Sequence, residues 1–272
     1  MFPQTKLVIF DKDGVLIETE LAKTESYFSA VLEINRDGIL LSIEEGSDYY
    51  SEFESIVPID GKAIEYPGLS KEQYANWHSR QLTGKSRGDA VRGILNQFPR
   101  LQGIINKKFD SYLKEISEIG GDPLKELYSD VFRYPYEQML SALRMKYYLR
   151  KPIEDCCKPI APMNQLFRLL LSQKTKVALI TESEWNRTAA ELKVCGIPRT
   201  SFEYIACKDQ IVNRRGKKVR TGGKKCDMYR DILCLTNVNE EDCLAIEDTD
   251  KGREEALVAG ITCFQVFIFT DK

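Results

Sequence analysis

The amino-acid sequence predicts an α/β protein, in which helices flank a parallel β-sheet and a mainly helical domain is inserted after the first strand. Near the start, Leu7–Phe10 is an unbroken apolar run, typical of a strand buried on both faces of a parallel sheet. From Pro159 onward, strand-like and helix-like segments alternate, which favours a parallel sheet with right-handed crossovers. Between about 20 and 155 the pattern is mainly helical, with no obvious parallel strand.

The core segments are short and are separated by residues that favour turns. The predicted strands are Leu7–Phe10, Lys176–Ile180, Phe202–Cys207, Cys243–Ile246 and Thr262–Phe267. The predicted helices are Met163–Leu171, Glu184–Val194, Cys226–Leu233 and Gly252–Ala259. We expect the basic stretch 214–220 to be a solvated loop.

The inserted domain has apolar residues at helical spacing, with Pro and Gly at the breaks. Its predicted helices are Thr19–Leu32, Lys71–Leu82, Ala90–Asn96, Leu101–Ile119, Pro123–Phe132 and Tyr136–Leu149. The acidic, aromatic stretch 43–66 has no clean period and is interpreted as a loop with short elements. We therefore predict a core domain of residues 1–18 and 156–272, and a helical domain of residues 19–155.

Composition excludes several classes of protein. Of the 272 residues 43% are hydrophobic and 29% charged, and the net charge of −2 argues against a general nucleic-acid binder. The sequence contains no apolar window of about 18 residues, so no membrane span is expected. The few residues before the first strand leave no room for a signal peptide. The 8 cysteines are scattered along the sequence, and there is only one histidine, so no zinc-site pattern occurs. We expect a cytoplasmic protein with reduced thiols, no zinc, and no need for more than a monomer.

Two carboxylates, Asp11 and Asp13, follow the first strand, and Gly14 allows a sharp turn. Ligands of parallel sheets gather beyond the carboxyl ends of the strands. One carboxylate there could attack phosphorus and bind Mg²⁺, while the other carries a proton. Lys12 between them is expected to point elsewhere. The alternative is an ordinary surface turn.

Residues 11–16, Asp-Lys-Asp-Gly-Val-Leu, resemble the first motif of the haloacid dehalogenase-like (HAD) hydrolase superfamily, most of whose members are phosphatases. The resemblance implies a Rossmann-like core and a Mg²⁺ cofactor. The stretch 177–183 resembles the second motif, which gives Thr181, with the backbone N–H of Glu182, a phosphate-binding role. Alternatively, Thr181 only caps the next helix.

The third motif of the family is a lysine before a helix, and here it is loosely matched. Both usual prolines are missing, and the usual lysine position falls on Gly223. Lys224 is the preferred candidate and Lys225 the alternative, because a cation must offset the charge of carboxylate and phosphate. Two solvent-exposed lysines at a helix start are the other interpretation.

The stretch 243–252 resembles the fourth motif, in which a strand ends in acids that point at the same cation as Asp11. The resemblance makes Asp248 a direct Mg²⁺ ligand. Glu247 would bind the ion directly or through water, since Mg²⁺ usually keeps several waters. As an isolated acidic loop the segment would be unremarkable, but Gly252 stands at the expected spacing.

Residues 82–87 resemble a loop of the cap domain in the β-phosphoglucomutase and phosphoglycolate phosphatase group. On that resemblance the inserted domain is a cap, and Lys85 and Arg87 are candidate specificity residues suited to an anionic substrate. A turn with solvated cations is an equally good interpretation. The acidic stretch 43–66 places this loop further from Asp11 than in compact caps.

The implied mechanism has Asp11 attack phosphorus and form an aspartyl-phosphate. Asp13 then protonates the leaving oxygen and later activates water. Asp11, the Asp13 backbone carbonyl, Asp248 and Glu247 would hold Mg²⁺. The expected substrate is a small phosphorylated metabolite. Two alternatives remain: a phosphomutase, disfavoured because no histidine precedes His78, and a catalytically idle binding protein on the same fold.

Overall fold

A computed structural model describes residues 5–44 and 87–266 of the chain. It divides into two compact units, one formed by Met1–Glu20 with Ile153–Lys272 and the other by Leu21–Pro152. We call them the α/β unit and the helical unit. The predicted helix Lys71–Leu82, the candidate Lys85 and all but the first two residues of the stretch 43–66 lie outside the described residues.

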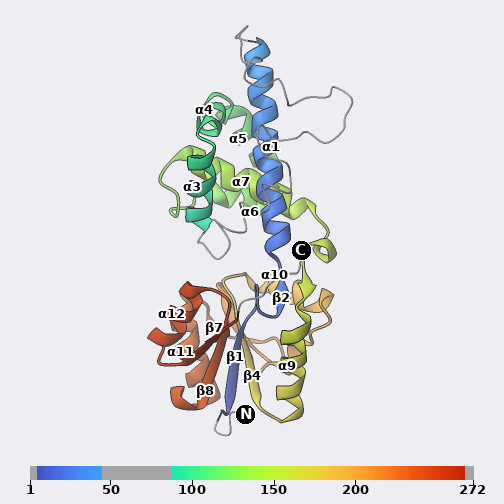
Figure 1. Cartoon of the computed structure of the whole chain (residues 1–272), viewed down its shortest axis with the longest axis vertical. Coiled ribbons are helices and arrows are strands. Elements are labelled where there is room, and N and C mark those ends of the chain that lie inside the picture. Colours follow the sequence, from blue (N-terminus) through green and yellow to red (C-terminus); the bar gives the residue numbers. More distant parts are fainter. Residues whose placement is uncertain (1–4, 45–86, 267–272) are drawn as a thin grey trace. The chain divides into compact units, whose positions relative to one another are not determined.

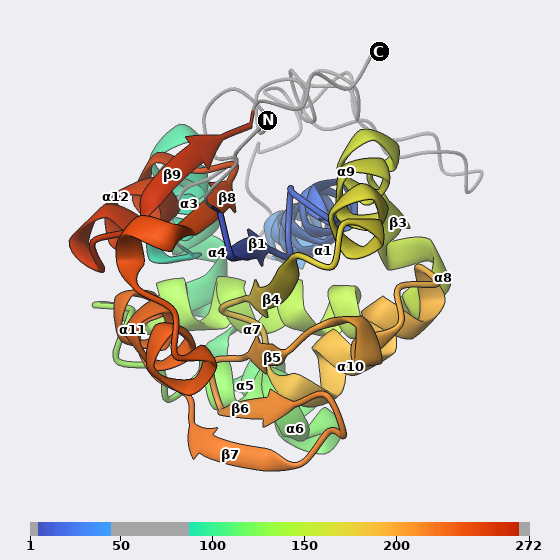
Figure 2. The same cartoon turned by 90° about the horizontal axis from the view of Figure 1, so that it is seen from below.

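The α/β unit is built on a seven-stranded sheet with the order β7-β6-β5-β4-β1-β8-β9 (Figures 1 and 2). Strand β1 lies between β4 and β8, and all three run parallel, as do the β4–β5 and β8–β9 pairs. The sheet therefore confirms the predicted mostly parallel α/β core. The strands are β1 Leu7–Asp11, β4 Lys176–Ile180, β5 Tyr204–Ala206, β6 Gln210–Asn213, β7 Lys218–Thr221, β8 Cys243–Glu247 and β9 Thr262–Gln265.

Helices cover both faces of this sheet, as the view from below shows (Figure 2). Helices α9 (Ala161–Ser172) and α10 (Trp185–Val194) cover one face, where Phe10 packs edge-on against Phe167 with ring centroids 5.9 Å apart. Helices α11 (Lys225–Thr236) and α12 (Asp250–Val258) cover the other face, against Leu7 and Ile9. Every residue of β1 is buried, because alternate side chains enter two different cores.

The β6–β7 edge differs from the prediction of a solvated loop at 214–220. Strand β6 pairs antiparallel with β5, and β7, which includes Lys218, pairs antiparallel with β6. The sequence signal was weak because β7 is an edge strand with mostly exposed side chains, so no apolar period marks it. A second, two-stranded sheet joins β2 (Ile17–Glu18) to β3 (Lys158–Pro159), and the short helix α8 (Ile153–Cys156) precedes β3.

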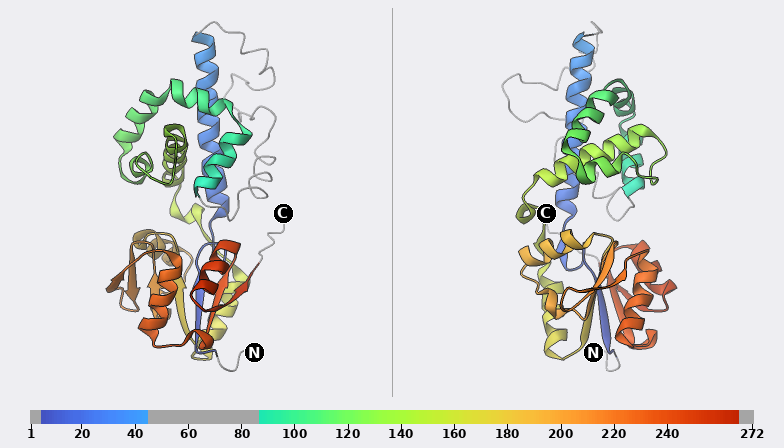
Figure 3. Two further views of the ribbon diagram at one scale, coloured as in Figure 1. Left: turned by 90° about the vertical axis from the view of Figure 1, so that its left-hand side faces the viewer. Right: turned by 180° about the vertical axis from the view of Figure 1, so that it is seen from behind.

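In the described part of the helical unit, the long helix α1 and five shorter helices share one hydrophobic core, in which α3, α4, α5 and α6 all contact α7 (Figure 3). The predicted single helix Leu101–Ile119 is wrong: Lys108 leaves helical geometry (φ −100°, ψ 10°) and separates two helices. The buried Lys146 ammonium lies 2.6 Å from the Glu33 carboxylate and ties the last helix to the first. The helices are α1 Glu20–Glu44, α3 Arg87–Gln97, α4 Arg100–Lys107, α5 Phe109–Ile119, α6 Gly121–Glu126 and α7 Pro135–Arg150. Within the described part of the chain, no helix combines the length and apolar character of a membrane span.

Candidate active site

Strand β1 ends at Asp11, whose exposed fraction is only 6%, and the chain then turns sharply at Gly14. Gly14 has φ +77°, a left-handed conformation that side chains disfavour. A Cβ atom at this position would also lie 1.9 Å from Asp248 Oδ2. Glycine is thus required here both for the backbone angle and for the close approach of Asp248.

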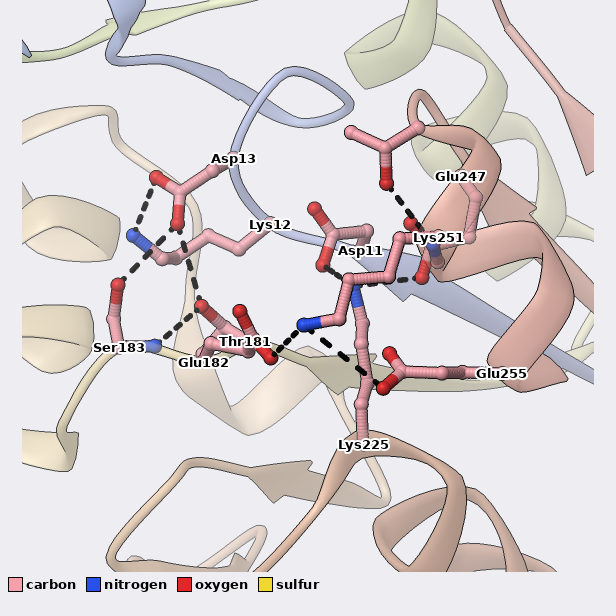
Figure 4. Close-up of polar contacts among 12 residues, drawn as sticks. Asp11, Lys12, Asp13, Thr181, Glu182, Ser183, Lys225, Glu247, Lys251 and Glu255 are labelled. Atoms are coloured by element: carbon pink, nitrogen blue, oxygen red, sulfur yellow. Dashed lines mark hydrogen bonds and ion pairs between the residues drawn. The ribbon is translucent and has the colours of Figure 1, made fainter. Parts of the chain in front are cut away.

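The neighbouring strands bring further polar groups to the same edge of the sheet (Figure 4). Thr181 follows β4, Glu247 ends β8, and Asp248 comes directly after it. Because the strands are parallel neighbours, their carboxyl ends meet at one edge. Oxygen atoms of Asp11, Glu247 and Asp248 lie within 4.8 Å of one another. The sequence prediction that these acids converge is therefore matched by the geometry.

Lys225, rather than Lys224, enters this acidic cluster. Its ammonium lies 2.6 Å from Asp11 Oδ1 and 2.8 Å from Glu247 Oε1. Lys224 is the exposed residue that precedes helix α11. The preference for Lys224 is thus corrected in favour of the alternative. Lys225 shares the buried face of α11 with Met228 at i+3, a spacing visible in the sequence that could have identified it.

The buried hydroxyl of Tyr229, one position further on that face, also contacts the cluster. It donates a hydrogen bond of 2.6 Å to Glu247 Oε1, the same oxygen that faces Lys225. Sequence reasoning missed Tyr229 as a site residue, although it stands at i+4 from Lys225. The lysine and the tyrosine together fix this carboxylate in position.

The electrostatics of the cluster follow from burial and close charges. Burial raises the pKa of Asp11 well above its usual value, Lys225 opposes that rise, and the neighbouring carboxylate of Glu247 adds to it. For Lys225 burial disfavours the charged form, but Asp11 and Glu247 outweigh it and raise the pKa of the ammonium. The lysine is therefore charged at neutral pH and compensates part of the negative charge.

The carboxylates also suit a divalent cation. Asp11, Glu247 and Asp248 offer hard oxygen ligands, the kind that Mg²⁺ prefers. Glu247 Oε2 is buried with no hydrogen-bond partner among the residues that the structure describes, and a Cβ atom at Gly252 would lie 2.1 Å from it. Glycine at 252 makes room for this carboxylate, and the unpaired oxygen is free to serve a ligand. These residues fit Mg²⁺.

Asp13 lies beside this cluster, and both of its carboxylate oxygens have hydrogen-bond partners. Its Oδ1 accepts hydrogen bonds from Lys12 Nζ at 2.9 Å and from Thr19 Oγ1 at 2.8 Å. Its Oδ2 has longer contacts, 3.4 Å to Thr181 Oγ1 and 3.3 Å to Ser183 Oγ. The expectation that Lys12 points elsewhere is wrong, because its side chain reaches the Asp13 carboxylate (Figure 4).

Thr181 is fully buried, and its hydroxyl accepts a hydrogen bond of 3.0 Å from the backbone N–H of Ser183. It does not cap the next helix, because Glu184 precedes α10. The exposed carboxylate of Glu182 pairs with Lys251 Nζ at 2.8 Å. Since a carboxylate repels phosphate, only the backbone N–H of Glu182 suits the anion-binding role expected for it.

Arg87 begins helix α3 of the helical unit, where its guanidinium pairs with the buried carboxylate of Glu126. It also lies over the ring of Phe132, 5.8 Å from the centroid. These contacts hold Arg87 within its own unit.

Comparisons with known proteins concern the whole chain. A family model described as a haloacid dehalogenase-like hydrolase matches residues 5–260. A HAD family hydrolase from Deinococcus radiodurans, solved with bound phosphate and sodium, has a TM-score of 0.53 and 17% identity, over 96% of this chain and 80% of that chain. A variant of CbbY from Rhodobacter sphaeroides, solved with xylulose-1,5-bisphosphate, has a TM-score of 0.50 and 16% identity, over 97% and 87%.

A predicted phosphoglycolate phosphatase from Haemophilus somnus has a TM-score of 0.53 and 11% identity, over 96% of this chain and 84% of that chain. No curated protein sequence matches the chain. At such low identities, the solved structures show a shared fold and nothing finer.

Proposed function

The chain belongs to the haloacid dehalogenase-like hydrolase family, and we propose that it is a Mg²⁺-dependent phosphatase acting on a small phosphorylated metabolite through an aspartyl-phosphate. The observation that carries this proposal is the pair of carboxylates, Asp11 and Asp13, held by separate partners. Asp11 contacts Lys225, whereas Asp13 contacts Lys12 and Thr19. Separate surroundings allow two carboxylates to take two different roles in one reaction.

In this mechanism Asp11 is the nucleophile. One oxygen, Oδ1, is held by Lys225, which leaves the other oxygen to attack phosphorus. Asp13 protonates the leaving oxygen and then takes a proton from the water that cleaves the aspartyl-phosphate. The Lys225 ammonium and the Thr181 hydroxyl offset the charge on the transferring group.

Asp11, the backbone carbonyl of Asp13, Asp248 and Glu247 would hold Mg²⁺. When bound, the ion would supply charge neutralisation for the phosphoryl oxygens. The three carboxylates that face one another support this assignment. The charge of Lys225 alone does not balance them, so a divalent cation completes the site.

The helical unit would serve as the cap that selects the substrate, with Lys85 and Arg87 as specificity residues. A relative of similar fold, the CbbY variant from Rhodobacter sphaeroides, was solved with xylulose-1,5-bisphosphate. That complex supports a small phosphorylated metabolite as the substrate class. A phosphomutase is the second candidate, because a mutase would use the same carboxylates. The lack of a histidine before His78 favours hydrolysis.

The test is phosphate release from a panel of phosphorylated metabolites, with Mg²⁺ or with EDTA, for the wild type and Asp11→Asn. We expect turnover that requires Mg²⁺ and falls at least 10³-fold in the variant, since covalent catalysis is lost. Exposed Asp209→Asn is the matched control and should keep wild-type turnover. Equal, negligible release from folded wild type and variant would contradict the proposal and favour a mutase or a binding protein.

A further inference from the structure

Lys12 stands between the two catalytic carboxylates, and its side chain is completely buried. Side chains alternate along β1, so Lys12 follows Val8 and Phe10 toward the face of the sheet covered by α9 and α10, opposite to Asp11. Burying an isolated ammonium is very costly, so a lysine at such a position requires partners of opposite charge.

Two carboxylates supply that charge. The Lys12 ammonium lies 2.9 Å from Asp13 Oδ1 and also pairs with Glu191 of helix α10, whose side chain is itself fully buried. Glu191 in turn accepts from Arg187 Nε at 2.7 Å, one helical turn earlier. The contacts form a chain of alternating charge from α10 to Asp13, through Lys12.

Burial and the neighbouring charges decide the charge state of each group along this chain. The nearby thiols are neutral, because burial raises the pKa of Cys157 and of Cys207 to about 12. Burial disfavours the Lys12 ammonium, yet Asp13 and Glu191 outweigh burial and raise its pKa. Lys12 is therefore charged at neutral pH.

The consequence for Asp13 is geometric. An aspartate carboxyl rotates broadly about its last torsion unless its oxygens are held. Here Oδ1 has short contacts to Lys12 and Thr19, and Oδ2 has longer contacts to Thr181 and Ser183. These contacts fix the plane of the Asp13 carboxylate, and Lys12 supplies one of the two short ones.

We infer that Lys12 is a positioning residue, which uses its buried ion pair with Glu191 to hold the Asp13 carboxylate in the orientation that proton transfer requires. The inference rests on the proposed function, because it assigns Asp13 to proton transfer. It adds α10, through Glu191, to the elements that build the site. A displaced general acid–base group slows the chemical step more than it weakens binding.

The single variant Lys12→Met removes one of the two cations that contact the buried Glu191 carboxylate and could fail to fold. The double variant Lys12→Met/Glu191→Met avoids this, because apolar residues of similar volume often replace a buried ion pair without loss of stability. Arg187→Met is the matched control, since it removes the outer member of the chain and leaves the contact between Lys12 and Asp13.

The measurement is kcat and KM with the best metabolite phosphate at saturating Mg²⁺, together with the melting temperature. For the double variant we expect a melting temperature near that of the wild type, KM within about threefold, and kcat lower by about 10- to 100-fold. Arg187→Met should keep kcat within about twofold. The single variant Lys12→Arg, which keeps the positive charge, should have a kcat between those of the wild type and the double variant.

A stable double variant with wild-type kcat would overturn the inference, because the ion pair would then be structural only. Equal losses of kcat in Arg187→Met and the double variant would overturn it as well. Absence of turnover in the wild type would instead contradict the proposed function, and the inference with it. The wild-type assay thus separates the two failures.

Discussion

The ammonium of Lys225 lies 2.6 Å from Asp11 Oδ1, although 214 positions separate the two residues in the sequence. The contact links the first strand to helix α11 and places a fixed positive charge on the carboxylate that would attack phosphorus. Lys225 is the first residue inside the helix, whereas Lys224 precedes it.

Replacement of Lys225 tests this relationship. We expect Lys225→Met to lower kcat/KM by about 10²–10³-fold, since one preorganised group facing the developing charge is lost. Lys224→Met is the matched control, because Lys224 is the adjacent, exposed lysine. Steady-state kinetics at saturating Mg²⁺ would check both. A larger loss in Lys224→Met than in Lys225→Met would contradict the assignment.

Mg²⁺ should stabilise the protein through Asp248. Ligand at 100 times its dissociation constant adds about 2.7 kcal/mol to the free energy of unfolding. We expect Asp248→Asn to abolish most of the Mg²⁺-induced rise in melting temperature, because a ligand carboxylate is lost. Exposed Asp250→Asn, two residues on, should retain it. Thermal unfolding with Mg²⁺ and with EDTA separates these outcomes, and a full shift in Asp248→Asn would argue against the ligand set.

Gly14→Ala should damage the site. The new Cβ would meet Asp248 Oδ2 at 1.9 Å in a backbone conformation with φ +77°, so Asp248 must move. We expect a fall in kcat of at least tenfold and a loss of about 1–2 kcal/mol in stability. Gly103→Ala, in helix α4 with nothing within 4 Å of its Cβ, should instead be neutral or stabilising by up to about 1 kcal/mol. Chemical denaturation and kinetics of both variants provide the comparison.

Tyr229→Phe removes a buried hydrogen bond of 2.6 Å to Glu247. Hydrogen bonds to charged groups contribute about 1.5–3 kcal/mol to the free energy of unfolding. We expect Tyr229→Phe to lower this free energy by an amount near the lower value, because Lys225 still contacts the same oxygen. Half-buried Tyr204→Phe is the control, since its hydroxyl has no hydrogen-bond partner among the described residues. Urea denaturation would measure both free energies of unfolding, and equal values would contradict a specific role for Tyr229.

Local sequence patterns were sufficient to predict the parallel core and to place Asp11, Thr181, Glu247 and Asp248 at one edge of the sheet. Each of these residues stands where an apolar strand ends, and parallel neighbours bring such ends to one edge. The edge hairpin β6–β7 escaped prediction because its exposed strand carries no apolar period. The break at Lys108 escaped as well, because the helical pattern continues through it.

By itself, the sequence determined the fold class, the family resemblance and the acids that follow the strands, because those features depend on local periodicity and short spacings. Only the tertiary structure decided which charges meet. The orientation of α11 about its axis turns Lys225 toward Asp11 and leaves the adjacent Lys224 exposed. Lys12 was paired with Glu191 by the packing of α10 on the sheet. Such pairs join residues far apart in the chain, where no local pattern records which side chains come into contact.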